Sequence, residues 1–208
     1  MKEKTFRLIE FFILFVIFPV SFAMDYPVAI KVSLGVLGFL YVLWVMIKLE
    51  GVTFFIQKEI HWGVFIKRTL VKFFVLAVFT ILFVLLTDKE RLFTFMIEKP
   101  LYWFLFTLVY ILFSVYPQEL LYRTFFFKRY SDFFKSEALL IFMNAILFSL
   151  AHLFFRNTMV HVLTFIGGVI FALTYQRTKS TLLVSIEHAL YGSWLFMVGM
   201  GGMLGFPT

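Results

Sequence analysis

The sequence predicts an all-α fold, a polytopic transmembrane helix bundle of about seven to eight spans, and the first observation behind this prediction is the composition. Of the 208 residues, 62% are hydrophobic, 22% are aromatic and only 15% are charged. An average soluble domain has about 25% charged residues, so a water-soluble domain of this size could not cover its apolar surface with polar side chains. Disordered chains are poor in aromatic and aliphatic residues. Both of these classes are therefore excluded.

The second observation is the length of the apolar stretches, because a helix needs about 17–25 residues to cross a bilayer. Seven stretches come close to this length or exceed it, at roughly 8–23, 28–47, 69–86, 101–127, 138–155, 158–175 and 181–206. The segment 51–67 mixes aromatic with charged residues, which is typical of a helix or loop at the membrane surface. An eighth short span is the alternative for this segment, and the tract 92–97 leaves the same choice open.

The third observation is the distribution of charge. The basic residues behind the net charge of +7 lie in short clusters between the apolar runs, so we do not expect nucleic acid as a partner. With seven spans and a cytoplasmic N-terminus, the outer loops hold only Lys89, Arg91, Lys99 and Arg156. Most of the other Lys and Arg residues then lie on the inner side, as the positive-inside rule requires. We therefore expect one integral membrane domain over residues 1–208, its N-terminus in the cytoplasm and its location a prokaryotic cell membrane.

Ionisable side chains inside a membrane span are costly, and they therefore indicate functional sites. In the fourth span Glu119 and Arg123 are four residues apart, so they share a helix face and can form an ion pair. Pro117 lies just before them and should kink the helix. The alternative is a structural pair in which Arg123 extends towards the membrane surface.

The fifth and seventh spans carry further polar residues. Asn144, Phe148 and His152 follow one another at steps of four on one helical stripe, and Glu187 and His188 lie in the seventh span. Glu119 and His152 are equally far from the polar residues 135–136. A hairpin that turns there would bring the two side chains to the same level, provided that the fourth helix continues past Arg129.

These residues resemble the motifs of the CPBP family, the CAAX protease and bacteriocin-processing proteins, also called Abi or type II CAAX prenyl endopeptidase-like intramembrane proteases. The family pattern is Glu-Glu-x-x-x-Arg, Phe-x-x-x-His and His-x-x-x-Asn on three membrane helices. The corresponding segments here begin at Gln118, Phe148 and His188 and lie within a motif-bearing core of about residues 101–208. The resemblance implies an intramembrane endopeptidase that cleaves peptide or lipidated-protein substrates in the bilayer.

The resemblance also implies roles for individual residues. In the family, the first glutamate of the pattern and the histidine of the second motif activate water. By resemblance to the three motifs, the catalytic positions in this chain are Gln118, Glu119, Arg123, His152 and His188. Supporting positions are Asn144, Phe148, Glu187 and Gly192. We expect no cofactor, and the alternative is a zinc site formed by Glu119, His152 and His188, since two histidines and a carboxylate can make an open site.

This chain departs from the family pattern at two positions. Gln118 replaces the first glutamate, and an amide cannot act as a base. Gly192 replaces the asparagine, which removes a potential oxyanion donor and leaves room for substrate or for another side chain. Three explanations of Gln118 stay open: an inactivating change, a natural pseudo-protease that binds a membrane partner, or a subgroup in which Glu119 or Glu187 serves as the base. A small transporter is a further alternative, but the internal repeats or broken helices expected of one are not evident.

Overall fold

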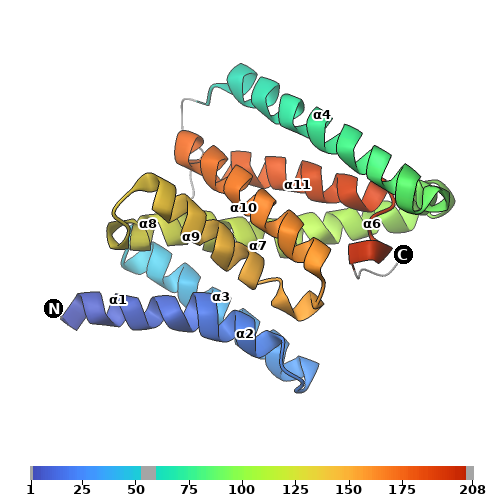
Figure 1. Cartoon of the computed structure of the whole chain (residues 1–208). Coiled ribbons are helices and arrows are strands. Elements are labelled where there is room, and N and C mark those ends of the chain that lie inside the picture. The colour runs from blue at the N-terminus through green and yellow to red at the C-terminus, as the bar shows by residue number, and fades with distance from the viewer. Residues whose placement is uncertain (1, 53–59, 205–208) are drawn as a thin grey trace. The chain divides into compact units, whose positions relative to one another are not determined.

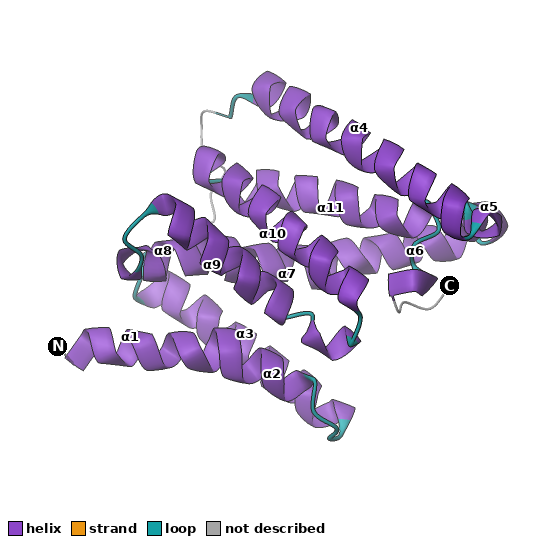
Figure 2. Ribbon diagram, in the orientation of Figure 1, coloured by secondary structure: helices purple, strands orange, loops and turns teal. Residues whose placement is uncertain are grey.

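The computed structural model describes residues 2–52 and 60–204, and in this part of the chain it contains only helices and the loops between them (Figures 1 and 2). Within these residues, six helical runs are long and apolar enough to cross a membrane: Glu3–Phe22, Val28–Lys48, Trp62–Thr87, Pro100–Phe133, Glu137–Phe155 and Thr158–Thr178. The prediction of an all-α polytopic bundle is therefore confirmed.

The contacts divide the chain into two compact units, and the first unit lies within Met1–Phe55 and Gln118–Lys179. Its helices are α1 (Lys2–Phe12), α2 (Phe18–Phe22), α3 (Val28–Lys48), α8 (Phe126–Tyr130), α9 (Glu137–Leu150) and α10 (Thr158–Thr178). Its π-helical turns are η1 (Ile13–Ile17) and η4 (Leu120–Phe125), and its 3-10 turns are η5 (Ser131–Phe133) and η6 (Leu153–Phe155).

The second unit lies within Ile56–Pro117 and Ser180–Thr208. Its helices are α4 (Trp62–Thr87), α5 (Thr94–Glu98), α6 (Pro100–Tyr110) and α11 (Thr181–Met197). Its turns are the π-helical η3 (Ile111–Val115) and the 3-10 turns η2 (Lys89–Arg91) and η7 (Gly202–Leu204). The short helix α7 (Tyr116–Glu119) contains the boundary between the two units.

The structure corrects two of the predicted boundaries and decides the choice left open for the tract 92–97. Helix α11 has 17 residues and ends at Met197, so the predicted span 181–206 is too long. The chain turns at Gly199, whose φ of +101° few other residues adopt. Helix α4 begins at Trp62, seven residues earlier than predicted, so residues 62–67 belong to a long helix, and residues 53–59 of that surface segment lie outside the described residues. The tract 92–97 forms only the five-residue helix α5, which is too short to span a bilayer.

Large apolar side chains remain exposed along the long helices of both units. Leu86 is 86% exposed on α4, and Phe113 is 77% exposed on η3. Soluble monomers rarely expose apolar surface on this scale. In a bilayer the same side chains contact lipid, which agrees with the predicted membrane location.

The helices α9 and α10 form a hairpin that holds the second motif, and they pack side by side (Figure 1). The two backbones approach closely at Gly168, where an added β-carbon would lie 2.9 Å from the Cα of Ala145. Small residues allow this kind of close contact between membrane helices. Both helices are capped at their N-termini: Ser136 Oγ accepts a hydrogen bond from the Leu139 amide, and Asn157 Oδ1 accepts one from the Met159 amide.

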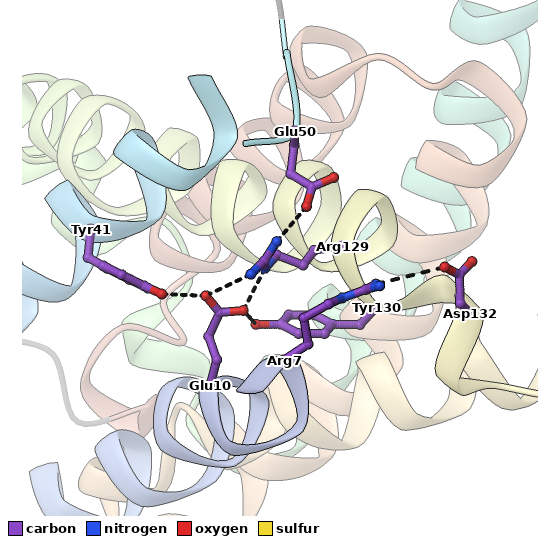
Figure 3. Close-up of polar contacts among 7 residues, drawn as sticks. All are labelled: Arg7, Glu10, Tyr41, Glu50, Arg129, Tyr130 and Asp132. Atoms are coloured by element: carbon purple, nitrogen blue, oxygen red, sulfur yellow. Dashed lines mark hydrogen bonds and ion pairs between the residues drawn. The ribbon is translucent and has the colours of Figure 1, made fainter. Parts of the chain in front are cut away.

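A buried cluster of charges ties α1, α3 and α8 together within the first unit (Figure 3). Arg129 donates from Nε to Glu10 at 2.5 Å and from Nη1 to Glu50 at 2.6 Å. The Glu10 carboxylate also accepts hydrogen bonds from the hydroxyls of Tyr41 and Tyr130. Glu10 and Arg129 are each only 5% exposed, and a buried charge is tolerated only when it is paired and hydrogen-bonded in this way.

Candidate active site

The acid of the first motif is engaged in a buried ion pair. Arg123 Nε lies 3.2 Å from Glu119 Oε2, and both side chains are fully buried. This confirms the pairing predicted from their spacing of four residues. Because the pair is fully buried, removing either partner would leave the other charge without compensation in an apolar interior.

The guanidinium of Arg123 is also anchored to the fifth predicted span. Arg123 Nη1 donates to Asn144 Oδ1 at 2.5 Å, and Asn144 Nδ2 donates to the backbone carbonyl of Tyr122 at 2.7 Å. Asn144 is fully buried, and both ends of its amide are satisfied within the first unit. Asn144 therefore connects α9 to η4 and fixes the direction of the arginine.

The ring of Phe148 packs between the arginine and the histidine of the second motif. Arg123 Cζ lies 4.7 Å from the centre of the Phe148 ring, a cation–π arrangement. The imidazole of His152 meets the same ring edge-on, with a centroid distance of 5.0 Å. Phe148 therefore links the buried ion pair of the first motif to the histidine of the second.

His152 lies just beyond the end of α9 rather than inside a continuous helix. Its backbone amide bonds to Ser149, in the tighter 3-10 pattern, and not to Phe148. The side chain takes over this position: His152 Nδ1 lies 2.8 Å from the carbonyl oxygen of Phe148. A carbonyl can only accept, so Nδ1 is the protonated nitrogen of this contact, and Nε2 carries the lone pair of the neutral ring.

The predicted turn before this helix is confirmed. The fourth predicted span stays helical to Tyr130, and α9 begins at Glu137 after the Ser136 cap. Two π-helical turns, η3 and η4, flank the short segment that holds the half-buried Gln118 and the buried Glu119. π-Turns are rare and are frequently found at functional sites. They shift the helix register before Gln118 and after Glu119.

The residues predicted in the seventh span lie in the second unit. Glu187 is fully buried and forms an ion pair with Lys72 of α4. Tyr191 donates its hydroxyl proton to Glu187 Oε1 at 2.7 Å, with the backbone carbonyl of Thr69 as a second acceptor at 3.1 Å. Glu187 therefore takes part in fixing α11 against α4. With its carboxylate held by a cation and a phenol, it is a poor candidate for a base.

His188 and Gly192 lie one helical turn apart on α11, and Tyr110 of α6 covers both. The ring centres of Tyr110 and His188 are 6.1 Å apart and nearly perpendicular. A β-carbon added at Gly192 would overlap the Tyr110 hydroxyl and would lie 2.6 Å from its Cζ. The space left by the missing third-motif asparagine is thus filled by another side chain, one of the two possibilities expected from the sequence.

The predicted zinc alternative takes Glu119 and His152 from the first unit and His188 from the second. Among residues 2–52 and 60–204, no group of three His, Cys, Asp or Glu side chains is placed to hold an ion. Glu119, the carboxylate of the predicted zinc alternative, is already paired with Arg123.

The structure thus brings the predicted residues together in two groups. The first group is a continuous network in the first unit, formed by Glu119, Arg123, Asn144, Phe148 and His152, and Gln118 directly precedes Glu119 in the chain. The second group lies on one helix of the second unit and consists of Glu187, His188 and Gly192. Two residues were missed as site residues, Lys72 and Tyr110. Lys72 had a signal, because a charge within an apolar span requires a partner. Tyr110 had none, because its role depends on a contact with a residue 82 positions later.

Residues 100–194 match the sequence model of the Rce1-like family, the type II CAAX prenyl endopeptidases. All three motifs lie inside this region. No curated protein and no solved structure matches the chain. The match confirms the resemblance predicted from the motifs, and together with the six apolar helices it supports an integral membrane protein of the protease class.

Proposed function

We propose that this chain is an intramembrane endopeptidase that hydrolyses peptide bonds of membrane-associated substrates, prenylated peptides among them. The match of residues 100–194 to the Rce1-like family supports this reaction class. The observation that carries the proposal is the fixed imidazole of His152, whose Nδ1 is held by the Phe148 carbonyl above a buried Glu119–Arg123–Asn144 network. A histidine fixed in one tautomer by its own backbone is suited to general base catalysis.

In this mechanism His152 Nε2 takes a proton from water as the water oxygen bonds to the carbonyl carbon of the substrate. The imidazolium then returns that proton to the amine as the carbon–nitrogen bond breaks, which leaves one carboxylate and one amine. His188 donates a hydrogen bond to the oxyanion of the intermediate, the interaction that contributes most to catalysis in many hydrolases.

Glu119 has a positioning role in this proposal. Its carboxylate is fully buried and paired with Arg123, so accepting a proton would leave the arginine uncompensated. Gln118 can orient the water through its amide but cannot take a proton from it. Removal of the proton from water therefore falls to His152, and we expect turnover to be slow.

The test is cleavage of a farnesylated CAAX peptide by the purified chain in lipid nanodiscs. We expect slow release of the C-terminal tripeptide, which the variants Glu119→Ala and His152→Ala each abolish. Gln118→Glu should raise turnover at least tenfold by adding a second base. The matched control Gln176→Glu places the same charge on α10 and should leave turnover unchanged. Full turnover in His152→Ala would overturn the proposal.

A pseudo-protease is the second candidate, and Gln118 is the observation that favours it. Such a protein would bind the farnesylated peptide without cleaving it, and Gln118→Glu would then create activity where none existed.

The zinc alternative is tested in the same assay. The chain is treated with a chelator and its metal content is measured before and after, and we expect neither turnover nor metal content to change. Loss of turnover on chelation, with recovery on adding Zn²⁺, would favour a metal enzyme instead.

A further inference from the structure

Tyr110 occupies a special position in the second unit. It is the last residue of α6, directly before the π-helical turn η3. Its ring packs edge-on against Phe196 at 5.1 Å and lies 6.1 Å from the ring of His188. The phenol is therefore fixed between two side chains of α11 rather than directed into lipid.

Gly192 is the residue that makes this placement possible. It lies four residues after His188, on the same face of α11, and a β-carbon there would come within 2.7 Å of two Tyr110 ring carbons. Any other residue at 192 would therefore displace the tyrosine. The Tyr110 hydroxyl can occupy this position only because residue 192 has no side chain.

The chemistry of the two neighbouring groups is complementary. A histidine and a phenol can both donate a hydrogen bond to an oxygen that develops negative charge. A tyrosine hydroxyl held by ring packing needs no reorganisation when that charge appears. Preorganised donors of this kind are worth about 10²–10³-fold in kcat each.

We propose that the Tyr110 hydroxyl is a catalytic hydrogen-bond donor, which acts with His188 on the carbonyl oxygen of the cleaved peptide bond from the space above Gly192. The inference rests on the proposed endopeptidase function and deepens it by assigning a second oxyanion donor. The chain thus supplies from α6 a donor that a glycine at 192 cannot supply.

The first test is Tyr110→Phe, which removes the hydroxyl and keeps the ring against His188 and Phe196. We expect kcat for the farnesylated peptide to fall about 10²-fold with KM unchanged, because the hydrogen bond strengthens only in the transition state. The conservative control is Tyr102→Phe on α6, whose ring is exposed, and it should leave kcat unchanged. Wild-type kcat in Tyr110→Phe overturns the inference.

The second test moves the donor to the other helix. Tyr110→Ala opens the space above residue 192, and the two double variants Tyr110→Ala/Gly192→Asn and Tyr110→Ala/Gly192→Ala fill it with and without an amide donor. We expect the asparagine variant to regain at least tenfold in kcat over Tyr110→Ala, and the alanine variant to regain none. Equal turnover in the two double variants means that packing alone matters, and it overturns the inference.

Both tests are run in the wild-type chain and in Gln118→Glu, so that slow turnover does not hide the effect. If neither chain cleaves the peptide, the proposed function fails and the catalytic role of Tyr110 fails with it. If both cleave it and Tyr110→Phe is as fast as its parent, only the role of Tyr110 fails.

Discussion

The imidazole Nδ1 of His152 lies 2.8 Å from the carbonyl oxygen of Phe148, one helical turn earlier in α9. In an α-helix that carbonyl would accept from the backbone amide of residue 152. The tighter turn at the end of α9 sends this amide to Ser149 and leaves the Phe148 carbonyl to the imidazole. The spacing of four between phenylalanine and histidine thus fixes one tautomer.

The first prediction concerns this histidine. His152→Ala should lower kcat by at least 10²-fold, because a positioned general base contributes about 10²–10⁴-fold. The side chain is only half-buried, so the thermal unfolding temperature should change little. His161→Ala is the matched control, a histidine of α10 with no role in the network, and its kcat should equal that of the wild type. Equal losses in the two variants would contradict the assignment.

The second prediction concerns the buried ion pair. Arg123→Met leaves the Glu119 carboxylate uncompensated in an apolar interior and removes the donor to Asn144. Loss of one partner of a buried pair costs about 3–5 kcal/mol of unfolding free energy. Arg123→Lys should recover only part of it, since an ammonium cannot reproduce the planar fork of the guanidinium. Denaturant unfolding in detergent micelles measures both changes.

The control for this prediction is an exposed ion pair. Arg156 is 65% exposed and Asp25 is 91% exposed at a separation of 3.1 Å. Solvent screens such a pair, so Arg156→Met should leave the unfolding free energy nearly unchanged. A loss in Arg123→Met no larger than in Arg156→Met would show that the buried pair does not stabilise the first unit.

Much of the first unit could be predicted from local spacing. The pair Glu119–Arg123 follows from the i,i+4 rule, and the turn at residues 135–136 follows from polar residues between two apolar runs. The first motif lies within the continuous helical run Pro100–Phe133, and the second lies in α9 and the turn that ends it. Contacts between residues a few positions apart in one helix can be predicted from residue spacing alone.

The remaining features depend on contacts between residues far apart in the chain. Tyr110 meets Gly192, and Lys72 meets Glu187, across separations that no local pattern encodes. The π-turns η3 and η4 and the early end of α9 were also not predicted, because one shifted hydrogen bond changes neither composition nor hydrophobic period. The end of α11 was placed too late because Val198, Met200 and Leu204 continue the apolar run beyond Met197.

The third prediction concerns the close approach of α9 and α10. A β-carbon at Gly168 would lie 2.9 Å from the Cα of Ala145, and backbone atoms cannot move aside as a side chain can. Gly168→Ala should therefore cost about 1–3 kcal/mol of unfolding free energy, the usual penalty of overpacking. Gly35→Ala is the matched control on α3, where nothing lies within 4 Å. It should be neutral or stabilising by up to about 1 kcal/mol, because alanine favours helix. Equal effects at both sites would exclude a tight contact at Gly168.

The fourth prediction is a double-mutant cycle on Lys72 and Glu187. Lys72→Met leaves a fully buried carboxylate without its cation and should destabilise the chain by about 3–5 kcal/mol. Adding Glu187→Leu removes that charge, and Tyr191 keeps the Thr69 carbonyl as acceptor at 3.1 Å. The double variant should therefore be more stable than Lys72→Met alone, because an apolar pair can replace a buried ion pair at little cost. Lys89→Met, at an exposed lysine of η2, is the control and should leave the unfolding free energy unchanged.

The same double variant also tests whether Glu187 takes part in the reaction. Glu187 is the neighbour of His188 but has no part in the proposed chemistry, so the double variant should retain cleavage. Loss of cleavage in a folded double variant would show instead that the carboxylate itself takes part in the reaction.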